Sequence, residues 1–222
     1  MKLLQKQKAK INNEPIIYHA RIEKGLKEIT PHKCKHDKAY VYASHNIALS
    51  IIFAIKRRGE NIDFGVDKWG HAYITELYPG GFEDRFRDRS CCLYFLPEKH
   101  FKLETEYIER VSEETVPVLG KIEIADSAAF LIDLAKKNQL NIIRYKYLTP
   151  KQKKEGEELL KKRMTGYAKF NNLSKEEYKK LKGEEKLQYD VQLERVTFCE
   201  KKFPELMAEA RENLKKEDTD NQ

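Results

Sequence analysis

Three kinds of side chain that could build a chemical site occur in order along the first half of the chain. His19 lies at the end of a short apolar run, and Tyr40 and Tyr42 lie two residues apart in a second run. Residues two apart point to the same face of a strand, so both phenol rings are expected on one side. An acidic stretch that contains Glu106 and Glu109 follows. These residue types, in this order, could form a binding or catalytic site.

Short strands and one apolar helix are expected to position these residues. The runs at 15–20 and 39–43 are short and rich in β-branched or aromatic residues, which is typical of strands. Apolar residues recur at helical spacing over 45–57, which predicts a helix with one buried face, and Ser44 is expected to cap it. Further strands are expected at 71–77, 92–96, 106–111, 116–124 and 140–147, with another helix from Asp126 to about 137.

The order of these elements predicts the fold class. Helices alternate closely with strands, and several connections between strands are too short for a helical crossover. We therefore expect an α+β domain whose sheet is largely antiparallel.

The residues around His19 and Tyr42 resemble the motifs of a known family. The segments 17–20 (Ile-Tyr-His-Ala), 25–26 (Gly-Leu) and 41–44 (Val-Tyr-Ala-Ser), with a helix after the last, are similar to motifs of the ADP-ribosyltransferase fold of the His-Tyr-Glu class. That class includes poly(ADP-ribose) polymerases, diphtheria-type toxins and rifampin-modifying transferases. The resemblance covers roughly residues 15–147. It implies a split, largely antiparallel sheet with flanking helices, and a cleft that binds NAD as a substrate.

The resemblance also implies a role for each matching residue. In the family, a main-chain amide and carbonyl beside the His hold the nicotinamide carboxamide, the His contacts a ribose, and the Tyr stacks on the nicotinamide ring. By this resemblance, His19 positions the ribose and Tyr42 stacks, while Tyr40 could replace Tyr42 or stack on the other face of the ring. The implied cofactor-binding residues are His19, Ala20, Arg21, Tyr40, Tyr42 and Ser44.

Two residues are candidates for the catalytic carboxylate of this class. Glu106 stands in the closer local match, Glu-Tyr-Ile, whereas Glu109 has the better spacing to the Val-Pro-Val run at 116–118. In an extended strand, residues three apart face opposite sides, so only one can serve, and we favour Glu109. The carboxylate would stabilise the oxocarbenium-like ribose that forms as nicotinamide leaves.

The chain departs from the family directly after His19. Ala20 and Arg21 stand where the family has Gly followed by Ser or Thr. Alanine is sterically tolerable, but the hydroxyl that contacts ribose is lost, and a guanidinium that can bind a phosphate takes its place. A catalytically inactive module that binds a nucleotide or nucleic acid is therefore the alternative to NAD-dependent ADP-ribosyl transfer or NAD hydrolysis.

A His-x-Cys-x-His pattern between the first two motifs could suggest a metal site. His32, Cys34 and His36 fall on one side of an extended chain. The lysines between them oppose a dication and no fourth ligand is evident, so no metal is expected. A basic loop beside a phosphate of the nucleotide fits these residues better.

Composition limits the classes of partner and compartment. The 222 residues carry a formal net charge of +7, which favours phosphate-bearing partners. No run approaches about 18 apolar residues and the N-terminus lacks the pattern of a secretory signal, so we expect a cytoplasmic protein with no membrane partner. The cysteines are expected to be free thiols; they are Cys34, Cys91, Cys92 and Cys199.

The chain changes character near residue 148. We predict an α+β domain over 1–148 and a charged helical extension over 149–222, in which Thr149 and Ser174 cap helices. Nearly half of the extension is charged, so it is expected to have little core of its own and could contact a partner. The charge-rich segment 82–89 is expected to be solvated. The acceptor of ADP-ribose is not indicated by the sequence.

Overall fold

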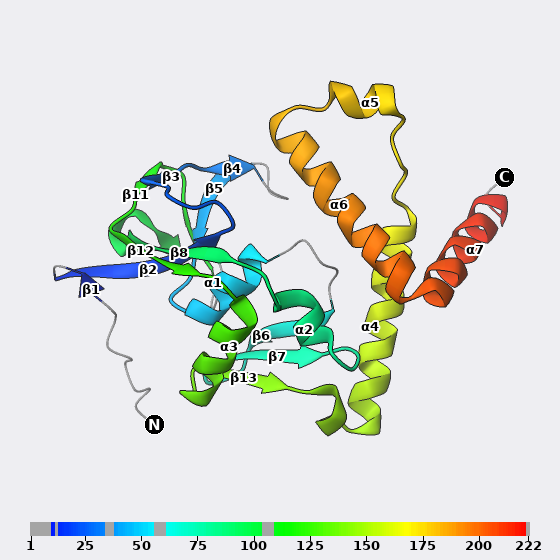
Figure 1. Cartoon of the computed structure of the whole chain (residues 1–222), viewed down its shortest axis with the longest axis horizontal. Helices are drawn as coiled ribbons and strands as arrows, with labels where there is room; N and C mark the ends of the chain where they lie inside the picture. Colours follow the sequence, from blue (N-terminus) through cyan, green and yellow to red (C-terminus); the bar gives the residue numbers. More distant parts are fainter. Residues whose placement is uncertain (1–9, 12, 34–37, 56–60, 104–108, 221–222) are drawn as a thin grey trace. The chain divides into compact units, whose positions relative to one another are not determined.

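The computed structural model describes residues 10–11, 13–33, 38–55, 61–103 and 109–220. Packing divides the chain into two compact units. Figure 1 labels the helices and strands of the chain. The first is Met1–Ile55, Gly65–Tyr73 and Phe86–Asn141, and the second is Lys56–Phe64, Ile74–Arg85 and Ile142–Gln222. The predicted division after residue 148 follows composition, whereas these units follow packing, so short pieces of the first 148 residues belong with the helical extension.

Within the described residues, the first unit contains two four-stranded sheets. One has the order β1-β2-β8-β12, and its strands are Lys10–Ile11 (β1), Glu14–Arg21 (β2), Cys91–Pro97 (β8) and Gly120–Ile124 (β12). The other has the order β4-β5-β10-β9, and its strands are His32–Lys33 (β4), Ala39–Ala43 (β5), Arg110–Ser112 (β10) and Lys102–Leu103 (β9). Neighbouring strands of both sheets run antiparallel. The predicted α+β class with largely antiparallel sheets is confirmed.

The two sheets of the first unit share one apolar core. Alternation along the strands places residues of β2 and β8 on the same face, where Ile17 lies opposite Leu96 and both are fully buried. Val41 and Ala43 of β5 belong to the same buried cluster. A short strand pair, Glu28–Ile29 (β3) with Val116–Pro117 (β11), adds buried Ile29 and Val116. The helix Ile47–Ala54 (α1) packs on β2 and β8.

The first residues of the helices in this unit agree only partly with the sequence prediction. Helix α1 is capped by Asn46, whose side chain accepts a hydrogen bond from the amide of Leu49 at 3.2 Å. The predicted cap, Ser44, is wrong because its main chain forms a bridge with Tyr18. The helix Ser127–Lys136 (α3) does begin after Asp126, whose carboxylate accepts from two amides.

Several predicted strands are shorter or divided. The predicted run at 116–124 forms two strands, β11 and β12, and the run at 140–147 forms Leu140–Ile143 (β13) followed by the 3-10 turn Tyr145–Tyr147 (η2). The run at 106–111 begins outside the described residues and contributes β10. The third sheet has the order β13-β7-β6, with Ile62–Val66 (β6) and Ala72–Glu76 (β7). The chain passes from one unit to the other within each of these strands.

Helices dominate the second unit. They are Gly81–Phe86 (α2), Pro150–Ala168 (α4), Lys175–Lys180 (α5), Gly183–Lys202 (α6) and Pro204–Asp220 (α7). Thr149 and Ser174 form capping boxes at α4 and α5, as predicted. The expectation of little core in the extension is wrong, because apolar side chains of α4, α6 and α7 meet while the charges face outward. The buried members are Met164, Tyr167, Val196, Cys199, Met207 and Ala210.

A closed network of ion pairs and hydrogen bonds surrounds Glu76 in the second unit. Glu76 is 3% exposed, and its carboxylate accepts from the guanidinium of Arg144 at 3.0 Å. Its two oxygens also accept from the amides of Phe82 (3.2 Å) and Tyr145 (2.9 Å). Arg144 donates in addition to Glu83 at 2.7 Å. The prediction that segment 82–89 is solvated is therefore wrong for helix α2.

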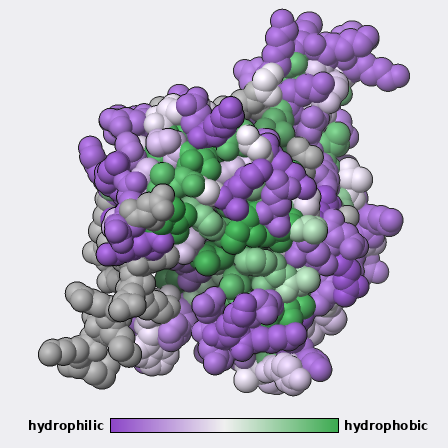
Figure 2. All heavy atoms as spheres, turned by 60° about the vertical axis from the view of Figure 1, so that its left-hand side comes forward, coloured by the Kyte–Doolittle hydropathy of each residue, from purple (hydrophilic) through white to green (hydrophobic). Residues whose placement is uncertain are grey.

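No helix in the described part of the chain is long and apolar enough to cross a membrane. Hydrophilic side chains cover much of the face drawn in Figure 2, with hydrophobic side chains between them. This distribution matches a chain in which 36% of the residues are charged.

Candidate functional site

His19 is a buried imidazole with one nitrogen fixed and the other available. The side chain is 7% exposed, and Nδ1 lies 2.6 Å from the main-chain oxygen of Tyr42. A carbonyl can only accept, so this contact assigns the ring proton to Nδ1 and leaves a lone pair on Nε2. Nε2 is buried and has no hydrogen-bond partner among the described residues.

The environment of His19 keeps the ring neutral. Burial is the main cause that lowers the pKa of His19 to about 4; the hydrogen bond to Tyr42 opposes this shift, and the positive charge of Arg21 acts in the same direction as burial. At neutral pH the imidazole is therefore an uncharged hydrogen-bond acceptor at Nε2.

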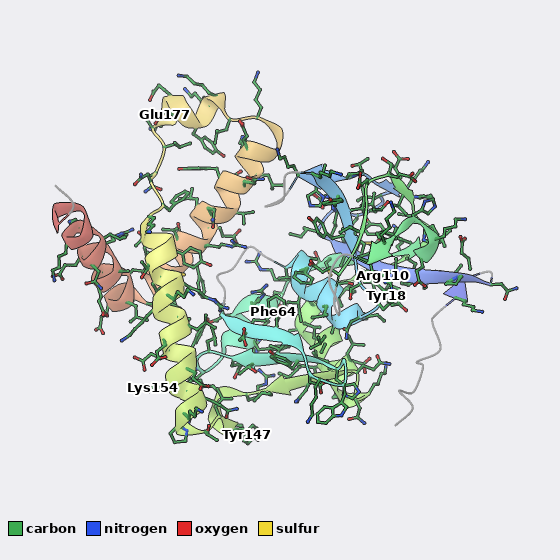
Figure 3. All side chains as sticks on the ribbon, turned by 180° about the vertical axis from the view of Figure 1, so that it is seen from behind. Tyr18, Phe64, Arg110, Tyr147, Lys154 and Glu177 are labelled. Carbon is green, nitrogen blue, oxygen red and sulfur yellow. The ribbon has the colours of Figure 1, made fainter. Side chains whose placement is uncertain are left out.

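A bridge between two strands places the Tyr42 carbonyl next to His19. Tyr18 of β2 exchanges two main-chain hydrogen bonds of 2.9 Å with Ser44, which directly follows β5. This bridge joins the two sheets at that point. Tyr18 and Arg110 lie in the same region (Figure 3), because Arg110 of β10 pairs with Ala43 next to the bridge. Ser44 is buried, and its Oγ accepts from the amide of Asn46, so the side chain has a structural contact.

Aromatic rings on β4 and β5 contact one another next to the strand position whose main-chain oxygen binds His19. The ring of Tyr42 contacts that of Tyr40 edge to face, with centroids 5.9 Å apart, so the two rings share a face as their spacing predicts. Tyr42 also meets the ring of His32 at 6.2 Å. The structure thus brings Tyr40, Tyr42 and His32 together, and their faces and edges could contact a flat heterocycle.

The main chain of Ala20 lies at an open edge of β2. Tyr18 directs its N–H and C=O toward Ser44, so the alternation of an antiparallel ladder directs those of Ala20 to the same side, away from β8. No hydrogen bond to either group occurs among the described residues. The side chain of Ala20 points to the opposite face from His19 and is buried. The methyl group of Ala20 therefore does not lie on the face of β2 that carries His19.

Arg21 continues the face of β2 that carries His19. Its guanidinium donates to Nδ1 of His32 at 3.2 Å, across from β2 to β4. His32 lies opposite Tyr40 in the β4–β5 pair. Two side chains of β2, two residues apart, therefore each contact the second sheet.

The loop after β2 is held from inside the core by Tyr94, which the sequence reasoning did not identify. Gly25 has φ of 75°, a backbone conformation that side chains other than glycine rarely adopt. This turn directs the amide of Leu26 to the hydroxyl of Tyr94 (3.3 Å), which itself donates to the carbonyl of Glu23 at 2.7 Å. Tyr94 is fully buried on β8 opposite His19. A buried aromatic in a strand was the only sequence signal for it.

The predicted carboxylates are placed only in part. Glu106 lies outside the described residues. Glu109 directly precedes β10, whose Val111 pairs with Tyr42. Its main chain is therefore near the end of β5, and the residue is half-buried. The structure brings Glu109 into the same strand neighbourhood as Tyr42.

The described residues contain no group of three or more His, Cys, Asp or Glu that could hold a metal ion. Cys34 and His36 lie outside them, while His32 contacts Arg21. Cys91, Cys92 and Cys199 are buried free thiols, as predicted for these three.

Comparison of the chain with protein-family models, with curated proteins and with solved structures found no match. The function of the site is therefore inferred from the residues that form it. The end of β2 carries an acceptor on His19 and the guanidinium of Arg21, which is linked through His32 to the phenol rings of Tyr42 and Tyr40. This set can bind a carboxamide, a hydroxyl and an anion on one ligand.

Proposed function

We propose that the chain binds NAD at the end of β2 and transfers its ADP-ribose to an acceptor or to water. The observation that carries this proposal is the buried Nε2 of His19, which has no hydrogen-bond partner in the described part of the chain. The main-chain N–H and C=O of Ala20, the next residue of β2, point away from β8 by the register of the ladder. Buried polar groups are rarely left unpaired unless a ligand or water completes them.

The same groups match the nicotinamide end of NAD. The carboxamide can donate to the carbonyl of Ala20 and accept from its amide, as a neighbouring strand would. Nε2 of His19 can accept from a ribose hydroxyl, because its proton is held on Nδ1 by Tyr42. The rings of Tyr40 and Tyr42 offer aromatic faces to the cationic pyridinium.

The reaction needs a leaving group and a carboxylate. The bond between C1′ of the ribose and the pyridinium nitrogen breaks, and its electron pair leaves with neutral nicotinamide. The resulting oxocarbenium-like ribose is stabilised by the carboxylate of Glu109 or Glu106. An oxygen of the acceptor, or of water, then forms a bond to C1′ and releases its proton to solvent. Hydrolysis therefore yields ADP-ribose, nicotinamide and a proton.

The alternative is a module that binds a nucleotide or nucleic acid without turnover. Arg21 favours it, because a guanidinium contacting His32 occupies the place of the hydroxyl that the transferase family uses. This alternative uses the same site but predicts no release of nicotinamide.

Nicotinamide release from NAD by the purified protein tests the proposal. We expect the wild type to release nicotinamide. Replacing the catalytic carboxylate, by Glu109→Gln or by Glu106→Gln, should slow release at least about a hundredfold. His19→Ala should also release nicotinamide much more slowly than the wild type. Glu113→Gln is the matched control, since Glu113 is an exposed acid that forms an ion pair with Lys38.

If no nicotinamide is released, the effect of NAD on the melting temperature distinguishes an inactive nucleotide-binding site from a site that does not bind NAD. A ligand that binds the folded state raises the melting temperature, so an inactive site still gives a shift that His19→Ala removes. Full turnover by His19→Ala would contradict the assigned mechanism. If NAD produced neither turnover nor a shift, both uses of this site for NAD would be excluded.

A further inference from the structure

The environment of Arg21 is unusual for an arginine, because its hydrogen-bond partner is another basic side chain. The guanidinium donates to Nδ1 of His32 at 3.2 Å. Arginine is charged and can only donate, so Nδ1 of His32 carries the lone pair and its proton lies on Nε2. The described residues contain no carboxylate within ion-pair distance of Arg21.

Among the described residues, the charges at this contact come from Arg21 and the exposed Lys33, because the hydrogen bonds of His19 and His32 leave both imidazoles uncharged. His19, Arg21 and His32 form one cluster, with Lys33 exposed next to His32 on β4. From the loop after β2, the charge of Glu23 raises the pKa of His19, but by less than the charge of Arg21 lowers it. From β5 and β8 the neighbours are the uncharged rings of Tyr42, Tyr40 and Tyr94. A fixed cation with neutral and basic neighbours attracts an anion.

The spacing connects this cluster to the ligand of His19. Alternate residues on one face of a strand are about 7 Å apart. That separation is comparable with the span from a ribose hydroxyl to the phosphate on the same nucleotide. A guanidinium can also contact two oxygens of a phosphate at once.

We infer that Arg21 and His32 bind a phosphate of the nucleotide whose ribose contacts His19. This inference rests on the proposed function, since it adds a phosphate subsite to the same site. The ligand class is then a nucleoside diphosphate derivative such as ADP-ribose or NAD. When it binds, Arg21 exchanges the neutral acceptor on His32 for an anionic oxygen of the phosphate, and His32 lies beside the same phosphate.

Binding of three probes to the wild-type protein tests the inference directly. We expect ADP-ribose to bind at least about tenfold more tightly than adenosine in calorimetric titrations, because charge-assisted hydrogen bonds are lost without the phosphates. Inorganic pyrophosphate is expected to bind more weakly than ADP-ribose, since it lacks the ribose. Equal affinity for ADP-ribose and adenosine would overturn the inference. Equal affinity for pyrophosphate and ADP-ribose would overturn the link between the phosphate subsite and His19.

Variants assign the phosphate preference to named residues. Arg21→Gln is expected to remove most of the preference for ADP-ribose over adenosine, and His32→Gln part of it. Arg21→Lys keeps the charge and is expected to retain a reduced preference. The control is Lys33→Gln, because Lys33 is the exposed cation next to His32. A Lys33→Gln loss as large as that of Arg21→Gln would show a general effect of surface charge and overturn the assignment.

A phosphate-free substrate separates failure of this inference from failure of the proposed function. If the protein cleaves nicotinamide riboside as efficiently as NAD, and Arg21→Gln changes neither, the phosphate subsite is wrong and the transferase proposal stands. If neither compound is cleaved but ADP-ribose is preferred through Arg21, the proposed function is wrong and the phosphate subsite stands.

Discussion

Two clusters of charged and polar side chains, one in each unit, differ in whether their buried atoms have partners. In the second unit both oxygens of Glu76 are bonded, to Arg144 and to main-chain amides. In the first unit Nε2 of His19 has no partner among the described residues, and Arg21 donates to an uncharged acceptor rather than to a carboxylate. A completed network stabilises the fold, whereas an incomplete one is stabilised further by a ligand.

Arg144 and Arg21 show the difference between the two clusters most clearly. Each is a guanidinium that reaches from one element to another, but Arg144 neutralises two carboxylates and Arg21 neutralises none in the described part of the chain. The closed cluster should therefore respond to mutation through stability, and the open cluster through binding.

The largest expected effect is on the closed cluster. Arg144→Leu leaves the carboxylate of Glu76 buried without its cation, so we expect the free energy of unfolding to fall by about 3–5 kcal/mol. Urea unfolding of the full chain measures the loss. The second change Glu76→Gln, made in the Arg144→Leu protein, should recover part of it because an amide carries no charge. A loss below about 1 kcal/mol would show that the cluster is not closed in solution.

The next effect concerns pH and His19. The folded pKa of about 4 lies below the ordinary value of 6.5, so between these values only the unfolded chain takes up this proton. The contribution of His19 to stability is complete above pH 6.5 and falls by about 3 kcal/mol in all as the pH drops to 4. His19→Gln should remove this part of the pH dependence, measured by urea unfolding at several pH values.

A second histidine provides the control for this pH effect. His71 is substantially exposed, beside Asp67 in the turn between β6 and β7. His71→Gln should leave the acid-induced loss of stability almost unchanged. If His71→Gln flattened the curve as much as His19→Gln, the low pKa would not belong to the buried ring.

The smallest expected effect on stability belongs to the open cluster. Arg21→Gln removes one hydrogen bond to an uncharged partner, so the unfolding free energy should change by about 1 kcal/mol or less. Chemical denaturation beside the Arg144→Leu protein measures both on one scale. A loss equal to that of Arg144→Leu would mean that Arg21 is structural, and the contrast between the two clusters would disappear.

The sequence predicted the elements that carry the candidate site better than the contacts within it. The runs at 15–20 and 39–43 formed strands because their residue types and alternation are local properties. The shared face of Tyr40 and Tyr42 followed from spacing alone. The hydrogen bond from His19 to the main chain of Tyr42 depends on how two sheets meet, which no local pattern specifies.

The errors have the same physical origin. Charge at 82–89 suggested solvent exposure, yet Glu83 is paired with Arg144, 61 residues later in the chain. Ser44 has the residue type of a helix cap, but its main chain forms the bridge with Tyr18. Asn46 caps helix α1 instead. The extension has few apolar residues, but three helices bring enough of them together at Met164 and Met207 to form a core. Long-range pairing decided each outcome.

The hydroxyl of Tyr94 holds the loop after β2 through main-chain atoms alone, the carbonyl of Glu23 and the amide of Leu26. A contact of this kind does not depend on the side chains of the residues it holds. Substitutions at the exposed positions Ile22, Glu23 and Lys24 can therefore accumulate without releasing the loop. The loop beside Arg21 can therefore change its side chains, and with them the ligands that the site recognises, during evolution. The strand that carries His19 is constrained by its packing in the core.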